Sequence, residues 1–413
     1  MASTHNRERN TLDAEIAELG IEQANAIDAD TTSLVGPEHE TDPALSIVMP
    51  TLNEEEGVAE CIERIKATVS QLGITTEVIV SDSSTDWTPE IASALGAKVV
   101  HPDEKGYGYA YRYAFERARG EYVVMADADC TYDFAELPKL LAAMIETNAD
   151  IVMGSRLEGE IESGAMPALH RYVGNPLLTR FLNVFYGTSV SDAHSGFRVF
   201  KWDVLEELEL NADGMEFASE MIMQAGAKGL TIEEVPIRYR ERKGEATLES
   251  FEDGWRHVRF MLLNAPGYLF SIPGTVLGIA GLLVMTLSYL NVSLGNWAIG
   301  IHSMIAGCVL TIVGYQIGSF GIFATLTSDP IRSPENSLTE WIVDHLRLKH
   351  GLMTGSALFA AGAGYAAYLF GSWVATGGSN LPLLKEDIVA LVALVLGIQT
   401  IFTAFFLSYL QST

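Results

Sequence analysis

Four long apolar runs dominate the C-terminal part of the chain. They extend over Leu269 to Leu290, Ile299 to Leu326, Met353 to Ala375 and Ile388 to Leu410, and none contains Asp, Glu, Lys or Arg. Each run is long enough for a helix to cross ~30 Å of hydrocarbon. One buried helix of a soluble protein can be this apolar, but four in succession are not expected. The pattern predicts a four-helix transmembrane domain over 269–413.

Before these spans, short β-branched runs alternate with amphipathic stretches. Strands are predicted at Leu45 to Met49, Val78 to Val80, Lys98 to Val100, Tyr122 to Met125 and Ile151 to Met153. Between the first two strands, apolar residues recur at helical spacing from Val58 to Leu72, with Asn53 as the predicted N-cap. This alternation predicts an α/β fold with a mostly parallel sheet covered on both faces.

Polar side chains follow four of the predicted strands. They are Asn53 and Glu54 after the first strand, Asp82 after the second, Asp127 and Asp129 after the fourth and Arg156 after the fifth. Ligands of such sheets bind beyond the carboxyl ends of the strands. We therefore expect these side chains to converge on one site.

Two acids one residue apart, Asp127 and Asp129, follow a strand that we expect to be buried. An Asp-x-Asp pair alone is a weak signal, because such acids usually face solvent. After a buried strand the carboxylates would repel each other, and Mg²⁺ or Mn²⁺ would neutralise them while bridging to substrate phosphates. Lys105 and Arg156 offer positive charge for a diphosphate, although Lys105 is equally well explained as a solvated loop residue.

The charge of the chain is strongly negative, with 53 acids, 26 Lys and Arg, and a formal net charge of −27. Nearly all of this excess lies before Leu269. Such a surface would repel nucleic acid, so DNA or RNA binding is not expected. Acid enrichment also suits strong brine, where the Debye length is ~3 Å at 1 M salt. The composition favours a salt-loving archaeon, and the alternative is simply an acidic protein.

The cysteines and the N-terminal residues indicate the cellular compartment of the protein. Cys61, Cys130 and Cys308 are widely spaced, which disfavours a disulfide framework or a zinc site and agrees with a reducing cytosol. Residues 1–43 hold ten acids, two bases and no apolar run, so they predict an acidic flexible tail rather than a signal peptide.

Basic residues near the spans predict the orientation in the membrane. Arg332, Arg347 and Lys349 lie between the second and third spans, whereas the other two connections carry only Lys385. Six more bases precede the first span: Arg238, Arg240, Arg242, Lys243, Arg256 and Arg259. The positive-inside rule then predicts a multi-pass cell-membrane protein whose large domain and both termini are cytoplasmic.

Seven segments occur in the order seen in family 2 glycosyltransferases: SIVMPTLNEEEG, VSDSSTDWT, KGYGYAYRYAF, ADADCTYDFAELPKLL, GSR, DAHSGFRVF and VPIRYRERKGEATL. The set, from about Leu45 to Leu248, resembles the dolichyl- or polyprenyl-phosphate mannose and glucose synthases, in their four-span membrane form. The resemblance implies a nucleotide-sugar-binding domain of the GT-A, Rossmann-like type over 44–249. An interfacial amphipathic helix over 250–268 and the four transmembrane helices would follow.

The resemblance also implies roles for individual residues. By this resemblance Pro50, Asn53, Glu54 and Asp82 hold the nucleoside, while Asp127 touches the ribose or the metal and Asp129 ligates the metal. Arg156 and Arg242 face the diphosphate or the acceptor phosphate, and Asp192 lies near the reacting centre. Ser195, Gly196 and Arg198 either shape the site or form a packed turn.

Three positions depart from the family pattern. Ser81 replaces the first acid of an Asp-Asp pair, and Thr131 stands where some members supply a Gln metal ligand. Ala246-Thr247 replaces a Ser-Lys pair, so binding of the acceptor phosphate is expected to depend more on Arg242, Lys243 and Arg171.

The expected reaction is inverting transfer of one hexose, mannose or glucose, from GDP-mannose or UDP-glucose to dolichyl or polyprenyl phosphate, aided by Mg²⁺ or Mn²⁺. The acceptor phosphate has a second pKa near ~6 and is already anionic, so Asp192 is expected to position groups rather than to remove a proton. Apolar stretches at Pro176 to Phe185 and Phe251 to Leu263 would admit the lipid tail, or would pack in the core. A homo-oligomer is compatible with the sequence.

Two other functions stay open at this point. A processive polysaccharide synthase would share the sheet and the membrane anchor, but its usual Gln-x-x-Arg-Trp block is not found. A non-catalytic lipid-linked sugar carrier or flippase would not need Asp127, Asp129 and Arg156 together.

Overall fold

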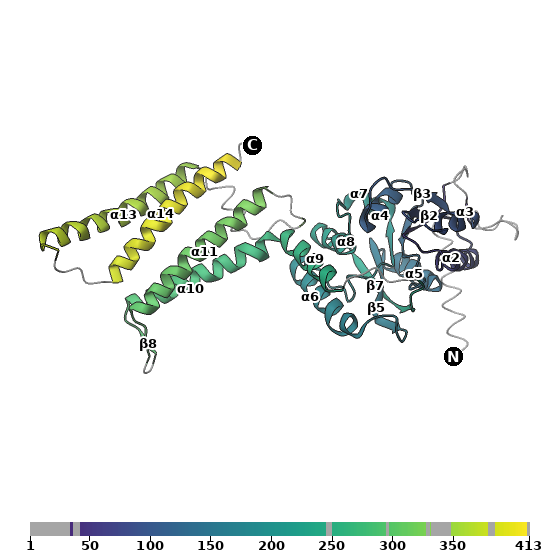
Figure 1. The fold of residues 1–413 in the computed structure, drawn as a ribbon, viewed down its shortest axis with the longest axis horizontal. Helices are drawn as coiled ribbons and strands as arrows, with labels where there is room; N and C mark the ends of the chain where they lie inside the picture. The colour runs from purple at the N-terminus through teal and green to yellow at the C-terminus, as the bar shows by residue number, and fades with distance from the viewer. Residues whose placement is uncertain are drawn as a thin grey trace. The chain divides into compact units, whose positions relative to one another are not determined.

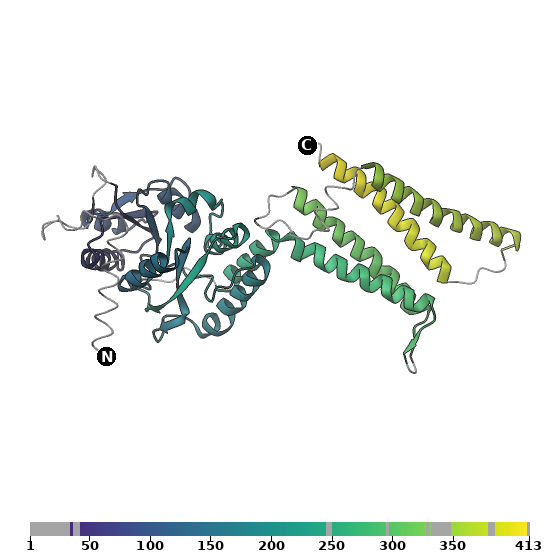
Figure 2. The same ribbon diagram turned by 180° about the vertical axis from the view of Figure 1, so that it is seen from behind.

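The computed structural model describes residues 34–35, 42–244, 250–294, 297–327, 331, 348–378 and 385–410. The chain divides into two compact units, 1–261 and 262–413 (Figures 1 and 2). Most of the predicted acidic tail, Ala246-Thr247, Arg332 and Arg347 lie outside the described residues.

The first unit contains a seven-stranded sheet of order β3-β2-β1-β4-β6-β5-β7 (Figure 1). Its strands are β1 (Leu45–Thr51), β2 (Thr76–Asp82), β3 (Lys98–Val100), β4 (Tyr122–Met125), β5 (Ile151–Ile161), β6 (Arg198–Lys201) and β7 (Ile232–Tyr239). Strand β6 pairs antiparallel with β4 and β5, and the other pairs are parallel. The predicted mostly parallel sheet is therefore confirmed.

All five predicted strands are present, but β6 and β7 were not predicted. Strand β6 has only four residues, too few to show a period. Strand β7 contains Pro236, which argues against a central strand. The structure reconciles this proline with a strand because β7 lies at the edge of the sheet.

The antiparallel strand β6 determines where the site forms. Arg198, its first residue, lies in register with Met125 of β4 and Met153 of β5. The turn that enters β6 therefore lies beside the end of β4 and beside the residues of β5 that follow Met153. Residues 192–197 are brought beside Asp127 in this way.

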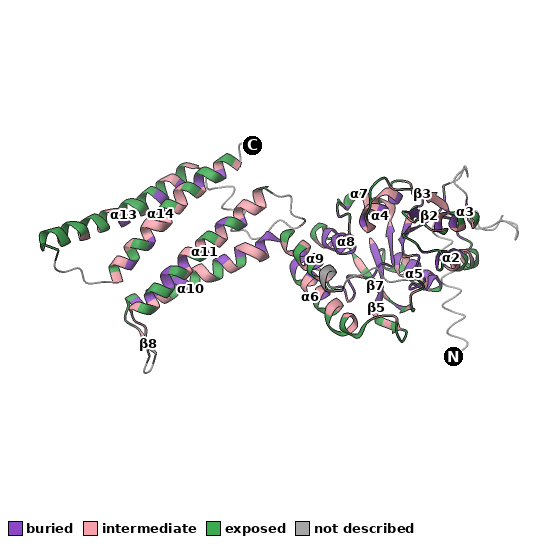
Figure 3. Cartoon of the chain, viewed as in Figure 1, coloured by how far each residue is buried: buried purple, intermediate pink, exposed green. Residues whose placement is uncertain are grey.

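Helices cover both faces of the sheet. Helices α2 (Val58–Leu72) and α5 (Leu137–Thr147) pack on one face, where Ile47, Ile62 and Leu140 are fully buried. Helices α4 (Tyr107–Phe115) and α8 (Phe217–Lys228) pack on the other face, where the Tyr111 and Phe217 rings stack with centroids 5.6 Å apart. Figure 3 shows the resulting buried core in purple. The shorter helix α3 (Thr88–Ala94) packs beside α2 on the first face, and α7 (Trp202–Glu207) follows β6.

The predicted helix at Val58 to Leu72 is confirmed, but the prediction of Asn53 as its N-cap is wrong. The N-cap is Gly57, and Asn53 lies four residues earlier with a φ of 60°. Its Oδ1 instead accepts hydrogen bonds from Thr85 N at 2.8 Å and Thr85 Oγ1 at 3.2 Å. Asn53 therefore links the loops after β1 and β2, since Asn tolerates this left-handed conformation.

Two further helices, α6 (Asn175–Tyr186) and α9 (Ser250–Leu263), pack against each other. Tyr186 of α6 donates its hydroxyl hydrogen to Met261 O at 2.9 Å. Leu182 and Phe185 are buried, so core packing accounts for part of the apolar face predicted for Pro176 to Phe185.

The second unit contains four helices that are long and apolar enough to cross a membrane, among the residues described. They are α10 (Ile272–Tyr289), which continues a π-helical turn at Gly267–Ser271, and α11 (Ile301–Thr327), α13 (Leu348–Ala375) and α14 (Lys385–Leu410). An apolar helix of membrane-spanning length thus lies at each of the four predicted spans. Gly274 and Gly314 allow close contact between α10 and α11, because a Cβ at either would lie 2.5 or 2.3 Å from backbone nitrogen of the other helix.

Candidate active site

The loops after β1 and β2 form one hydrogen-bonded unit. Thr51 Oγ1 donates to Asp82 Oδ1 at 2.7 Å, and Asn53 N donates to Ser84 Oγ at 2.8 Å. Asp82 is almost fully buried, and Ser84 N approaches its second carboxylate oxygen at 3.3 Å. Pro50, one residue before Thr51, is half-buried and in register with Ser81. The structure thus brings Pro50, Asn53 and Asp82 together, and Asp82 already holds this loop pair in place.

Three carboxylates gather beside these loops: Glu54, Asp127 and Asp129, which we term the acidic triad. Burial raises the pKa of Glu54 to about 7, an effect that Arg242 opposes and that Asp129 and Asp127 reinforce. Burial, followed by the charge of Asp129, raises the pKa of Asp127 to about 6. Glu54 and Asp127 are therefore held in a place where burial and neighbouring carboxylates both disfavour their charged forms.

Gly57 allows the loop after β1 to lie directly on the Asp127–Asp129 turn. A Cβ at this position would lie 2.8 Å from Ala128 O, a distance that Cβ atoms essentially never adopt. The absence of a side chain is what lets Glu54 approach the two aspartates.

Asp129 is held from both sides. Its Oδ1 accepts hydrogen bonds from Thr131 N at 3.0 Å and Thr131 Oγ1 at 2.6 Å. Its Oδ2 lies 3.5 Å from Arg242 Nη1. Thr131 therefore orients the carboxylate, and Oδ2 faces the remainder of the site.

Arg242 reaches the triad through a segment that continues from β7. Tyr239 forms an antiparallel bridge with Tyr132, and Arg240 N and Lys243 N then donate to Thr131 O at 2.8 Å and Asp129 O at 3.0 Å. This run places Arg242 Nη2 2.5 Å from Glu54 Oε1. The sequence marked Arg242 through a motif, but the strand that delivers it was not predicted.

Arg156 and Asp192 form a buried bidentate ion pair. Arg156 Nε and Nη2 lie 2.7 and 2.8 Å from the two Asp192 carboxylate oxygens, and Arg156 N donates to the first of these at 3.0 Å. Burial would raise the pKa of Asp192, but the charge and hydrogen bonds of Arg156 outweigh it and hold that pKa below its usual range. Both Asp192 oxygens are thus engaged by arginine.

The turn that contains Ser195 and Gly196 is held by Arg198. This guanidinium is fully buried and donates to three backbone carbonyls, those of Ser195 at 2.8 Å and of Ala193 and Ala218 at 2.9 Å. Burial lowers the pKa of Arg198 to about 10. Arg198 is a structural cation that fixes the shape of the turn.

The structure does not bring the remaining predicted cations to the triad. Lys105 is exposed at the start of α4, and the guanidinium of Arg171 lies 5.4 Å from the Tyr172 ring centre. The Lys243 side chain pairs with Glu60 of α2. The roles of these three residues in phosphate binding stay predictions.

The side chains of the triad can hold a divalent cation only together with ligands from water or substrate. No three His, Cys, Asp or Glu side chains within the described residues are placed to hold a metal by themselves. Mg²⁺ and related cations are commonly held by one or two carboxylates together with water and substrate phosphates. The neighbouring carboxylates of the triad and the oriented Oδ2 of Asp129 suit such a cation.

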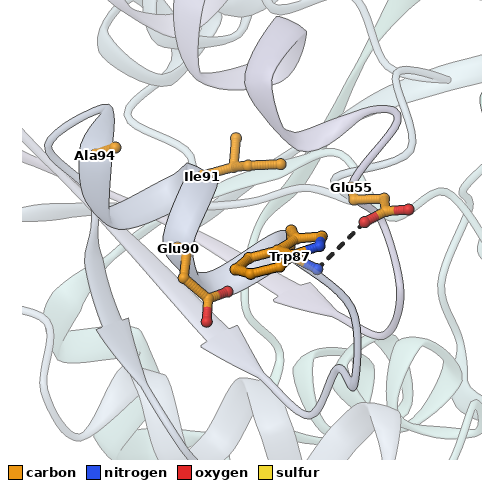
Figure 4. A pocket seen from close by; sticks show the side chains of 5 residues that line it. All are labelled: Glu55, Trp87, Glu90, Ile91 and Ala94. Atoms are coloured by element: carbon orange, nitrogen blue, oxygen red, sulfur yellow. Dashed lines mark hydrogen bonds between the residues drawn. The ribbon is translucent and has the colours of Figure 1, made fainter.

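A surface hollow of about 460 Å³ lies apart from these groups. It is lined by Glu55, Trp87, Glu90, Ile91 and Ala94, and Trp87 N donates to Glu55 Oε2 at 3.2 Å (Figure 4). None of the predicted site residues lines it.

The pKa shifts of the triad predict how stability depends on pH. Glu54 and Asp127 have raised pKa values in the folded state, so the folded chain binds more protons than the unfolded chain between about pH 4 and 7. Without divalent cations, stability should fall as the pH rises through this window. Mn²⁺ should stabilise the protein more at pH 8 than at pH 5, because it neutralises the ionised triad.

Thermal unfolding of the full chain in detergent, with EDTA or Mn²⁺ at both pH values, measures this effect. Glu54→Gln should reduce the fall with pH, because it removes one of the two shifted groups. Equal stabilisation by Mn²⁺ at both pH values contradicts the prediction.

Comparisons with known proteins agree with this architecture. The model "Glycosyl transferase family 2" matches residues 46–209, and "Glycosyltransferase family 2 C-terminal transmembrane region" matches residues 326–411. The "Low-salt glycan biosynthesis hexosyltransferase Agl6" of Haloferax volcanii is 55% identical over 377 residues, which cover 91% of each chain.

Two further similarities are more limited. The "Dolichyl-phosphate hexose transferase" of Haloferax volcanii is 34% identical over 210 residues, 51% of this chain and 89% of its own. A structure of glucosyl-3-phosphoglycerate synthase from Mycobacterium tuberculosis, with Mn²⁺, UDP and glucosyl-3-phosphoglycerate, covers 54% of this chain and 80% of its own, at 25% identity and a TM-score of 0.44.

The chain belongs to glycosyltransferase family 2, in the form that carries a C-terminal transmembrane region. It is therefore an enzyme, a multi-pass membrane glycosyltransferase with a GT-A type domain. The resemblance that the sequence motifs indicated is confirmed.

Proposed function

We propose that this enzyme transfers one hexose, mannose or glucose, from a nucleotide sugar to dolichyl or polyprenyl phosphate with inversion at the anomeric carbon. The observation that carries the proposal is the acidic triad with Arg242 at the edge of the sheet, in a chain with four membrane-length helices. The names of the two Haloferax relatives, a hexosyltransferase and a dolichyl-phosphate hexose transferase, support the sugar class and the acceptor. The product would supply hexose for protein glycosylation or surface-polymer assembly.

The donor would lie along the loops after β1 and β2. Pro50, Asn53 and Asp82 form the joined loops where a nucleoside would bind. Glu54, which pairs with Arg242 beside these loops, would contact the same part of the donor. Both uridine and guanosine donors are compatible with this placement of the nucleoside.

Negative charge grows on the diphosphate as the bond to the sugar breaks. A divalent cation, Mg²⁺ or Mn²⁺, held by Asp129 with Asp127, would supply electrostatic stabilisation of that charge. Arg242 adds a fixed positive charge beside Asp129. Charges that match the transition state better than the ground state accelerate the reaction.

The acceptor phosphate needs no general base. Its second pKa near ~6 leaves it anionic at neutral pH, and Asp192 has both oxygens engaged by Arg156. Arg156 and Arg242, with Arg171 and Lys243 as further candidates, would bind this phosphate. Attack by a phosphate oxygen on the face opposite the leaving diphosphate is a single displacement, which inverts the anomeric carbon.

An exposed apolar surface offers a place for the lipid. Large apolar side chains on and before α6 are solvent-exposed (Leu169, Tyr172, Val173 and Leu177), as is Trp255 on α9. Aromatic and aliphatic side chains of this kind, with Arg256 and Arg259 nearby in sequence, suit the interface of a bilayer. By the positive-inside rule, we place this domain and both termini in the cytoplasm.

Two rival functions are disfavoured by specific features. A processive synthase needs a polymer-conducting pore, and four spans without Asp, Glu, Lys or Arg in their apolar runs are poorly suited to one. A non-catalytic carrier has no need for three neighbouring carboxylates that repel one another.

The proposal is tested by supplying radiolabelled GDP-mannose, UDP-glucose and UDP-N-acetylglucosamine in turn to membranes that contain the enzyme. We expect label in the extracted lipid with one hexose donor, and none with the Asp129→Ala variant. Label that accumulates in a long, water-soluble polymer would favour the processive synthase. A variant as active as the wild type would refute the assignment of the site.

A further inference from the structure

Tyr107 holds one oxygen of Asp127. Its hydroxyl donates to Asp127 Oδ1 at 2.8 Å, and the Tyr111 hydroxyl, one turn along α4, lies 3.4 Å from the same oxygen. No hydrogen bond within the described part of the chain engages Asp127 Oδ2. Since Asp127 is half-buried, Oδ2 is the oxygen left for a ligand.

The start of α4 is pinned, so Tyr107 has little freedom to move. Asp213 O accepts hydrogen bonds from Gly108 N at 2.8 Å and Tyr109 N at 3.2 Å. Gly106 has a φ of 146°, and a Cβ there would lie 2.3 Å from Asp213 O. Glu220, buried in α8, in turn accepts hydrogen bonds from the backbone of residues 211 and 212 at 2.9–3.0 Å.

Gly196 lies on the opposite side of the Asp127 carboxylate and, having no Cβ, leaves space beside Oδ2. A Cβ at this glycine would lie 3.1 Å from Asp127 Oδ2 and 3.4 Å from the Tyr107 hydroxyl oxygen. Gly196 N donates to the Tyr132 hydroxyl oxygen at 2.6 Å, which fixes this turn in place. The carboxylate is thus confined between Tyr107 and the Gly196 turn.

We propose that Tyr107 is a positioning residue for the nucleotide sugar: it covers Asp127 Oδ1 and so presents Oδ2 to the ribose or to the cation of a bound nucleoside diphosphate. The inference rests on the proposed function for this ligand class. A hydrogen bond from a hydroxyl to a carboxylate is stronger than one between neutral groups, and a carboxylate fixed beforehand loses less freedom on binding. The effect should therefore appear in donor affinity and leave acceptor affinity unchanged.

The Tyr107→Phe variant tests this directly, because it removes the hydroxyl and keeps the ring that packs edge-on against Tyr111 at 5.1 Å. The matched control is Tyr109→Phe in the same helix, whose hydroxyl bonds to Asp103 at 2.5 Å, away from the triad. The dissociation constants of GDP and UDP with Mn²⁺, measured by calorimetry on the full chain in detergent, are compared with the KM values for donor and polyprenyl phosphate.

We expect Tyr107→Phe to weaken nucleoside diphosphate binding about tenfold and to raise the donor KM similarly. The KM for polyprenyl phosphate should stay within about twofold, and Tyr109→Phe should match the wild type. Gly196→Ala, which places a methyl group against Oδ2, should also weaken the nucleotide while keeping the Tyr107 bond.

Wild-type nucleotide affinity in Tyr107→Phe, or equal changes in the KM of donor and acceptor, would overturn the inference. The binding measurement contains no acceptor. It therefore still tests the role of Tyr107 if the enzyme transfers no sugar to lipid phosphate. A wild-type protein that binds nucleotide but does not transfer sugar refutes the proposed function alone. A wild-type protein that binds no nucleoside diphosphate refutes both.

Discussion

Asp129→Asn is expected to lower the rate of hexose transfer by about a hundredfold to a thousandfold, the range found when a group that stabilises transition-state charge is removed. The amide can still accept a hydrogen bond from Thr131 through its oxygen, so the turn should keep its shape. Its NH₂ group would then face Arg242 where a carboxylate oxygen now lies. The site loses the negative charge that would hold a cation. It also gains a hydrogen-bond donor, the Asn NH₂ group, beside the Arg242 guanidinium, which is itself a donor.

The measurement is transfer of labelled hexose at saturating donor across a series of Mn²⁺ concentrations. Asp133→Asn is the matched control: Asp133 lies on the same loop, accepts a hydrogen bond from Ala135 N at 3.2 Å and pairs with Arg240. We expect the control to stay within a fewfold of the wild type. An Asp129→Asn variant with more than a tenth of wild-type activity contradicts the proposed metal ligand.

Asp192→Asn should lower both stability and activity, because it leaves the buried Arg156 charge without its partner. Breaking one half of a buried ion pair costs about 3–5 kcal/mol of unfolding free energy. The pH dependence of the remaining activity should keep its wild-type shape, since Asp192 is not expected to accept a proton during transfer.

A double-mutant cycle separates this positioning role from a general base. The pair Arg156→Met with Asp192→Asn should be less destabilised than Asp192→Asn alone, because no unpaired charge is buried. Denaturant unfolding and pH–rate profiles of the three variants provide the comparison. If Asp192→Asn keeps wild-type stability and its activity loss varies steeply with pH, Asp192 is a base after all.

The elements that sequence predicted well are those whose pattern is local. The strands from β1 to β5, the helix after Gly57 and the four membrane spans each carry a period or a run that one segment alone displays. Asp127 and Asp129 were found because they follow a strand whose carboxyl end must lie at the ligand-binding edge.

The elements that sequence missed depend on contacts between distant segments. Arg242 meets Glu54 only because Tyr239 bridges to Tyr132 and the chain then runs along Asp129. No local pattern encodes that bridge. The pairing of Arg156 with Asp192 likewise joins residues 36 positions apart.

The sequence did not predict the ion-pair partners of individual residues for the same reason. Lys243, one residue from Arg242, pairs with Glu60 on α2. The sequence did not single out Tyr107 within its motif, because the alternating tyrosines of α4 do not reveal which one faces Asp127. In both cases the direction of a side chain on its backbone decides the partner.

The most direct test of the account uses purified enzyme in detergent with Mn²⁺ and labelled nucleotide sugars, and compares polyprenyl phosphate with the polyprenol of equal length. We predict a lipid-linked hexose, with one nucleoside diphosphate released per sugar, from the phosphate and none from the alcohol. No glycolipid from any donor, or equal transfer to the alcohol, would contradict the account.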